Sequence, residues 1–84
     1  NLQEYEQYSL GIVACNYYLA ESKRLTKCYH EALSLLEASM KELKAKGLYG
    51  RLTIFYTQAG QIAYEANQYG LAKSYFKKAN NLSR

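Results

Sequence analysis

Apolar side chains recur every three or four positions along most of this chain, which is the spacing of one face of an α-helix. Near the N-terminus the pattern gives two adjacent apolar stripes, and a helix with two such stripes is covered on more than one side. The first stripe consists of Tyr5, Tyr8, Ile12, Cys15 and Leu19, and the second of Leu10, Val13, Ala14 and Tyr17. The pattern therefore predicts a helix over residues 2–21.

The same spacing predicts three further helices, at residues 27–46, 51–66 and 69–82. Polar or glycine-containing connections separate them. Thr26 is the candidate N-cap of the second helix, and Gly47 ends that helix. Its core stripe consists of Tyr29, Ala32, Leu33, Leu36, Met40 and Leu43. Because the connections are short, sequential helices are expected to be antiparallel neighbours.

The last two helices have less uniform packing faces. In the third helix, either Ile54 or Phe55 is expected to face the core. The other packing positions of this helix are Tyr56, Ala59, Ile62 and Ala63. The fourth helix has one apolar side, which consists of Tyr69, Ala72, Phe76, Ala79 and Leu82, while Lys73, Lys77 and Lys78 face away.

Composition supports an all-α fold in one domain over residues 1–84. Ala, Leu, Lys, Glu and Gln supply 42 of the 84 residues, whereas Val, Ile and Thr supply 7 and Pro is absent. This balance favours helices over a β-sandwich or barrel. No apolar run is long enough to span a membrane, and no secretory signal is present. A cytoplasmic location is therefore expected, and the start at Asn1 rather than Met suggests an excised part of a longer protein.

Small and aromatic residues follow a defined spacing in the second half of the chain. The third helix carries Tyr56, Ala59, Gly60 and Ala63, and the fourth carries Ala72, Phe76 and Ala79. This pattern resembles the tetratricopeptide repeat, in which small residues let two helices cross closely and aromatic residues fill the space between layers. The resemblance covers about residues 51–84. It implies two helix hairpins stacked as a fragment of an α–α solenoid.

Residues 2–46 resemble the same repeat more loosely. We align Leu10 and Gly11 with Ala59 and Gly60, but the segment from Gly11 to Ala32 is then nine residues longer than its counterpart. The first repeat is therefore expected to have longer helices or a looser turn. A plain four-helix bundle with coincidental spacing is the alternative architecture.

The chain offers no set of catalytic or metal-binding residues. His30 is the only histidine and Asp is absent, so a Ser–His–Asp triad cannot be built. Cys15 and Cys28 match no metal or redox spacing, and we expect buried or half-buried free thiols. We therefore expect a protein that is not an enzyme and needs neither a cofactor nor a metal.

The resemblance implies a concave groove lined by the first helix of each hairpin. On those faces it places Tyr5, Tyr8, Ser9, Ile12, Asn16, Ile54, Thr57, Gln58, Gln61 and Glu65. This mixture of aromatic and amide side chains suits a peptide or protein segment. Self-association through the end helices is also expected, because exposed apolar faces mark interfaces. Similar repeats with long helices occur in bacterial regulators, which implies a regulatory or sensor role.

A nucleic-acid-binding helical module is the alternative function. The formal net charge is +4, and basic residues gather at the predicted helix ends. Lys23, Arg24 and Lys27 form one such group, and a second lies beside Tyr75 in the last helix. Cations near helix C-termini also complement the helix dipole, so the charge alone does not require a phosphate ligand. We therefore expect nucleic-acid binding to be the less favoured function.

Overall fold

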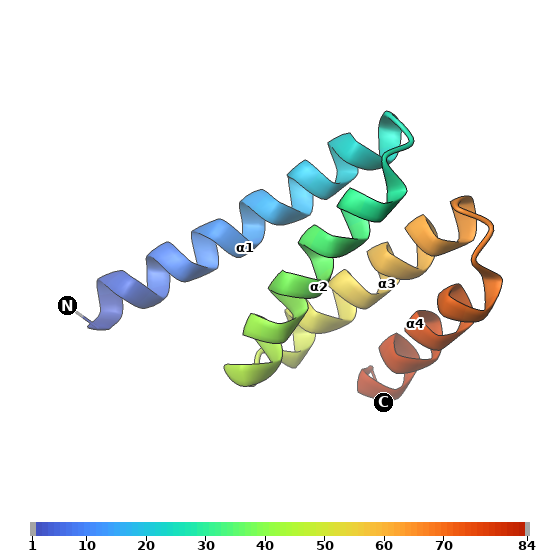
Figure 1. The fold of residues 1–84 in the computed structure, drawn as a ribbon. Coiled ribbons are helices and arrows are strands. Elements are labelled where there is room, and N and C mark those ends of the chain that lie inside the picture. Colours follow the sequence, from blue (N-terminus) through green and yellow to red (C-terminus); the bar gives the residue numbers. More distant parts are fainter. Residues whose placement is uncertain (1, 84) are drawn as a thin grey trace.

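The computed structural model describes residues 2–83, without the side chains of residues 2, 3, 5, 6 and 8. This part of the chain forms four α-helices and no strand. They are α1 (Leu2–Leu25), α2 (Tyr29–Ala45), α3 (Tyr49–Glu65) and α4 (Tyr69–Leu82). Sequential helices run antiparallel in a flat array measuring 43 × 31 × 13 Å (Figure 1). The predicted all-α fold is confirmed: the hairpins α1–α2 and α3–α4 pack against each other.

Each pair of sequential helices is joined by a three-residue turn of the same type. Its middle residue has a positive φ, which is 64° at Lys27, 70° at Gly47 and 64° at Asn67. The amide after this residue donates to a carbonyl in the preceding helix, as Cys28 N does to Lys23 O at 2.8 Å. This bond is typical of the Schellman ending of a helix. The turns at positions 27, 47 and 67 therefore divide the chain into units of about 20 residues.

The first turn lies later in the chain than the sequence pattern predicts. The helix α1 continues to Leu25 instead of ending at Glu21, and α2 begins at Tyr29. Thr26 does not cap α2, because its hydroxyl donates back to the carbonyl of Lys23 at 3.0 Å. The N-cap of α2 is Cys28, which makes no side-chain capping bond.

The core lies between the hairpins and confirms the predicted stripe of α2. On α1, Val13 is buried, while Ile12, Cys15 and Leu19 of the first stripe are exposed. In α3, Phe55 is the one of the two alternatives that faces the core. The other corrections are in α4, where Tyr75 is 7% exposed whereas Phe76 and Tyr69 of the predicted apolar side are 40% and 58% exposed. The buried apolar residues are Val13, Ala20, Ala32, Leu33, Leu36, Met40, Leu43, Leu52, Phe55, Ala59, Ile62, Ala63, Ala72, Tyr75 and Ala79.

The two hairpins correspond to each other with a shift that the sequence alignment missed. Because Lys27 and Asn67 occupy the same place in the same turn, each position in the first hairpin corresponds to a position 40 residues later. Ala32 then corresponds to Ala72, as predicted, and both are buried. The counterpart of Gly60 is the buried Ala20. The alignment of Gly11 with Gly60 is wrong, since a Cβ on Gly11 would have no neighbour within 4 Å.

Candidate functional site

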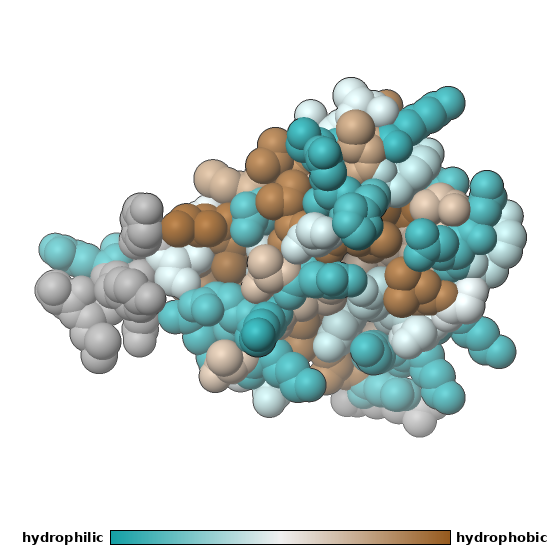
Figure 2. All heavy atoms as spheres, viewed as in Figure 1, coloured by the Kyte–Doolittle hydropathy of each residue, from teal (hydrophilic) through white to brown (hydrophobic). Residues whose placement is uncertain are grey.

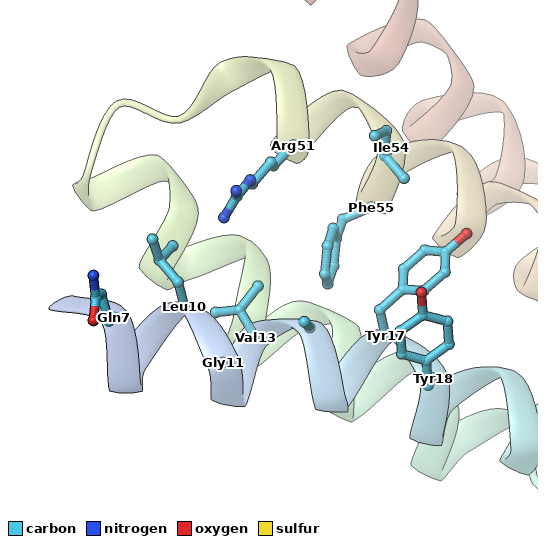
Figure 3. A pocket seen from close by; sticks show the side chains of 10 residues that line it. Gln7, Leu10, Gly11, Val13, Tyr17, Tyr18, Arg51, Ile54 and Phe55 are labelled. Carbon is cyan, nitrogen blue, oxygen red and sulfur yellow. The ribbon is translucent and has the colours of Figure 1, made fainter. Parts of the chain in front are cut away.

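A groove of about 590 Å³ lies between α1 and the N-terminal half of α3 (Figure 3). It follows the second apolar stripe of α1, whose side chains face α3 across the opening. The described residues that line it are Gln7, Leu10, Gly11, Val13, Ala14, Tyr17 and Tyr18 from α1 and Arg51, Ile54 and Phe55 from α3. Most of these side chains are apolar or aromatic, so the groove offers a largely apolar surface to a ligand.

The floor of the groove is well packed and its rim is open to solvent. Phe55 points from α3 towards α1, between Val13 and Tyr17 (Figure 3). The Tyr17 and Phe55 rings meet edge-on, with centroids 5.3 Å apart, a favourable geometry for an aromatic pair. At the rim, Ile54 is 54% exposed and Tyr18 is 72% exposed. These two side chains are therefore accessible to a bound molecule.

One cation stands at this otherwise uncharged groove. Figure 3 shows the exposed side chain of Arg51 extending from α3 towards α1. None of the described lining residues is acidic, and Arg51 forms no ion pair with another described residue. The guanidinium is thus free to bind a carboxylate from outside the described chain. Arg can donate two parallel hydrogen bonds to the two oxygens of a carboxylate.

A polar network joins α1 to α3 near their C-terminal ends. Arg24 donates to both carboxylate oxygens of Glu65, at 2.8 and 3.0 Å. It also contacts Glu21, which in turn accepts a hydrogen bond from Gln58. The hydrogen bonds from Arg24 and then from Gln58 lower the pKa of Glu21 below its ordinary value of 4.5. The pair of helices is therefore held together beside the groove by charged and amide groups.

Three residues of this network were predicted from the sequence to line the ligand groove. Gln58 donates to Glu21, Gln61 donates to Glu65 at 2.8 Å, and Glu65 pairs with Arg24. Their polar groups are thus satisfied within the chain. We infer that they set the spacing of α1 and α3, which is a structural contribution to the groove.

Two further predicted residues face α2 instead of the groove. Ser9 donates to Glu42 at 2.7 Å, and the amide of Asn16 donates to the hydroxyl of Ser39 at 3.1 Å. Ser39 is 2% exposed, so its hydroxyl needs this partner inside the protein. Ser9 and Asn16 therefore join the helices of the first hairpin.

The remaining predicted residues are divided among several places. Ile12 is exposed on the outer side of α1, and the Thr57 hydroxyl donates to the carbonyl of Thr53 at 3.0 Å. The side chains of Tyr5 and Tyr8 lie outside the described part of the structure. Ile54 is the one predicted residue among the described lining of the groove.

Sequence reasoning missed most of the lining, although a signal for it was present. The second stripe of α1, which includes Leu10, Val13 and Tyr17, is as regular as the first stripe. Periodicity alone does not show which of the two stripes faces α3. No pattern in the sequence places Arg51 beside an apolar groove, so its position was also missed.

Other reactive side chains are dispersed over the described surface. Cys15 and Cys28 are free and exposed, which corrects the expectation of buried or half-buried thiols. His30 is exposed at the start of α2. No three His, Cys, Asp or Glu side chains in the described part of the chain gather closely enough to hold a metal ion. None of the four described helices combines the length and apolar character needed to cross a membrane.

Comparison with known proteins gives no relative for this chain. It matches no protein-family model. No curated protein and no solved structure is similar to it.

Proposed function

We propose that this chain is a non-catalytic interaction module that binds a peptide or protein segment in the groove between α1 and α3. The observation that carries the proposal is an exposed apolar groove with one cation beside it. Its volume of about 590 Å³ is within the usual range for ligand sites. Such sites combine many apolar contacts with a few polar groups that orient the ligand.

The lining indicates the chemistry of the segment. An apolar side chain of the ligand would lie against Val13, Phe55 and the Tyr17 ring, where it loses contact with water. A carboxylate, from an acidic side chain or a chain terminus, would pair with Arg51. The tyrosine hydroxyls at the rim are suited to hydrogen bonds with the backbone of the segment.

The architecture also supports this assignment. We propose that the chain is a fragment of a tetratricopeptide-like solenoid, in agreement with the spacing of Gly60, Ala72 and Ala79. In that family the resemblance implies a ligand surface on the first helix of each hairpin. The groove lies between α1 and α3, which are those two helices.

Nucleic-acid binding is less well supported, because part of the basic surface is engaged within the chain. Lys23 pairs with Glu31 at 2.9 Å, and Arg24 pairs with Glu21 and Glu65. In the last helix, the ammonium of Lys78 lies 5.8 Å from the centroids of both the Tyr56 and Tyr75 rings. These contacts leave fewer free cations for phosphate groups.

Selection from a displayed peptide library tests the proposal. The 84-residue chain would be immobilised, and selected peptides would be measured by fluorescence anisotropy. Ile54→Lys should weaken binding about tenfold or more, because it puts a charge at the apolar rim. Ile12→Lys is the matched control, since Ile12 is similarly exposed at 45% but lies outside the groove.

Arg51→Glu should weaken only those peptides that carry a carboxylate, and raised salt should weaken the same peptides. Binding that Ile54→Lys leaves unchanged would contradict the proposal. Failure to select any peptide would also contradict it. Selection of an oligonucleotide with steep salt dependence would instead favour the nucleic-acid function.

A further inference from the structure

The outer face of the first hairpin, on the side away from α3 and α4, is apolar and exposed. On α1 it presents Ile12 at 45% exposure, Leu19 at 46% and the thiol of Cys15. Hydrophobic atoms gather along α1 in the space-filling view (Figure 2). A shallow pocket of about 360 Å³ lies between this face and α2, lined by Leu19, Lys23, His30, Glu31, Ser34, Leu35 and Ala38.

In the second hairpin, the positions equivalent to this face of α1 are covered by other helices. With the 40-residue shift between the hairpins, Ile12, Cys15 and Leu19 correspond to Leu52, Phe55 and Ala59. These three residues of α3 are 1%, 5% and 0% exposed. Equivalent apolar positions are therefore buried in α3 and open in α1. The two faces have a similar total side-chain volume, because Leu19 is larger than its counterpart Ala59 while Cys15 is smaller than its counterpart Phe55.

Two elements cover this face of α3 in the chain: α1, whose Tyr17 ring meets the Phe55 ring edge-on, and the preceding helix, α2. The helix α2 shares the hydrophobic core with α3 through a face whose residues are spaced i, i+3, i+7 and i+10. These residues are Leu33, Leu36, Met40 and Leu43, and the most exposed of them is Leu33 at 7%. The contact of α2 with α3 is thus a template, within one chain, for a helix bound to α1.

At the opposite end of the stacked hairpins, the outer face of α4 is mostly polar. The residues of α4 that correspond to this face of α2 are Lys73, Phe76, Asn80 and Ser83, and all four are exposed. A polar outer face is typical of the last unit of a solenoid. Because α4 presents mostly polar residues and α2 is already covered, a second copy of this chain has no suitable helix to offer head-to-tail.

We propose that the outer face of α1 binds an amphipathic helix of a partner, in the way that α3 binds α2. The partner helix carries apolar residues at i, i+3, i+7 and i+10. The charges next to the face need no counter-charge from this helix, since Lys23 and Glu31 pair with each other at 2.9 Å. This surface is separate from the groove, so its test does not depend on the proposed function.

A peptide with the sequence of residues 29–45 is the probe. A lactam between the side chains of Glu37 and Lys41, one turn apart and exposed in α2, would fix it as a helix. Its helicity would be verified by circular dichroism. Titration into the intact chain should give saturable binding, weakened about tenfold by Ile12→Lys or Leu19→Lys. Ile54→Lys, in the groove, should leave binding unchanged.

Each other outcome overturns the proposal. Absence of binding by a peptide of verified helicity removes the docking face. Equal binding to the wild type and to both folded α1 variants does the same. Loss of binding in Ile54→Lys alone would place the peptide in the groove. Sedimentation of the chain without peptide tests whether a second copy of the chain binds this face. Self-association that Ile12→Lys abolishes would assign the face to that second copy.

Discussion

The ring of Phe76 lies directly over Gly60, so a Cβ on Gly60 would lie 2.7 Å from the nearest ring carbon. The corresponding positions of the first hairpin hold Ala20 and Leu36, both fully buried. The first hairpin therefore combines a methyl group with Leu, while the second combines no side chain with a larger ring. Each combination fills the crossing of two helices with a similar total volume.

Replacing Gly60 with Ala should destabilise the fold by about 1–3 kcal/mol, because the new methyl group meets a ring that is packed against the helix. Gly11→Ala should stabilise it by about 0.5–1 kcal/mol, because Gly11 is in a helix and its Cβ would meet open space. Urea unfolding followed by circular dichroism measures both changes.

The double variant Gly60→Ala with Phe76→Leu should recover much of the loss, since it recreates the pairing of the first hairpin. The rescue is informative because the second substitution alone removes apolar surface. Equal effects of Ala at positions 11 and 60 would support the alignment of Gly11 with Gly60 and contradict the 40-residue shift.

The first turn carries a conformational strain that Gly47 avoids in the second turn and that Asn67, a residue more tolerant of positive φ than Lys, reduces in the third. Lys27 adopts a φ of 64°, which glycine tolerates and most other residues do not. Lys27→Gly should therefore stabilise the chain by about 0.5–1 kcal/mol. Gly47→Lys, the reverse change in the second turn, should destabilise it by a similar amount. Thermal melts of the pair check the prediction, and a loss of stability in Lys27→Gly would contradict it.

The network around Arg24 makes the stability of the fold depend on pH, with a loss of stability at acidic pH. Because folding lowers the pKa of Glu21, its contribution is present above the ordinary value of 4.5 and is lost as the pH falls through the folded value. Glu31 and Glu42 also have lowered pKa values, so the wild type alone does not isolate Glu21. The stability difference between the wild type and Glu21→Gln should shrink between about pH 6 and about pH 3. A difference that stays constant over this range would show that the Glu21 contacts do not contribute.

The sequence was sufficient for the helices but not for the roles of their faces. Periodicity located all four helices and the core stripe of α2, because these depend on local spacing. It did not distinguish the two stripes of α1, since both are apolar and only the docking of α3 decides which is covered. Ser9 and Asn16 were assigned to the ligand for the same reason, although their partners Glu42 and Ser39 lie on α2.

The first turn was misplaced because the signal that locates it in the sequence is only a weak 20-residue period. Lys27 has no turn preference, so the first turn could not be located from its own residues. Tyr29, Tyr49 and Tyr69 each begin a helix and are 20 positions apart. Comparing these three tyrosines would have aligned Ala20 with Gly60 and identified the outer face of α1.

Two-dimensional NMR of the isotope-labelled chain, titrated with a library-selected peptide, tests the central claim most directly. We predict that the amides shifted most will be those of residues 10–18 in α1 and 51–55 in α3, which surround the groove. Ile54→Lys should remove these shifts and Ile12→Lys should preserve them. Shifts concentrated in α4 or on the outer face of α1, with residues 51–55 unaffected, would contradict the assignment of the groove as the binding site.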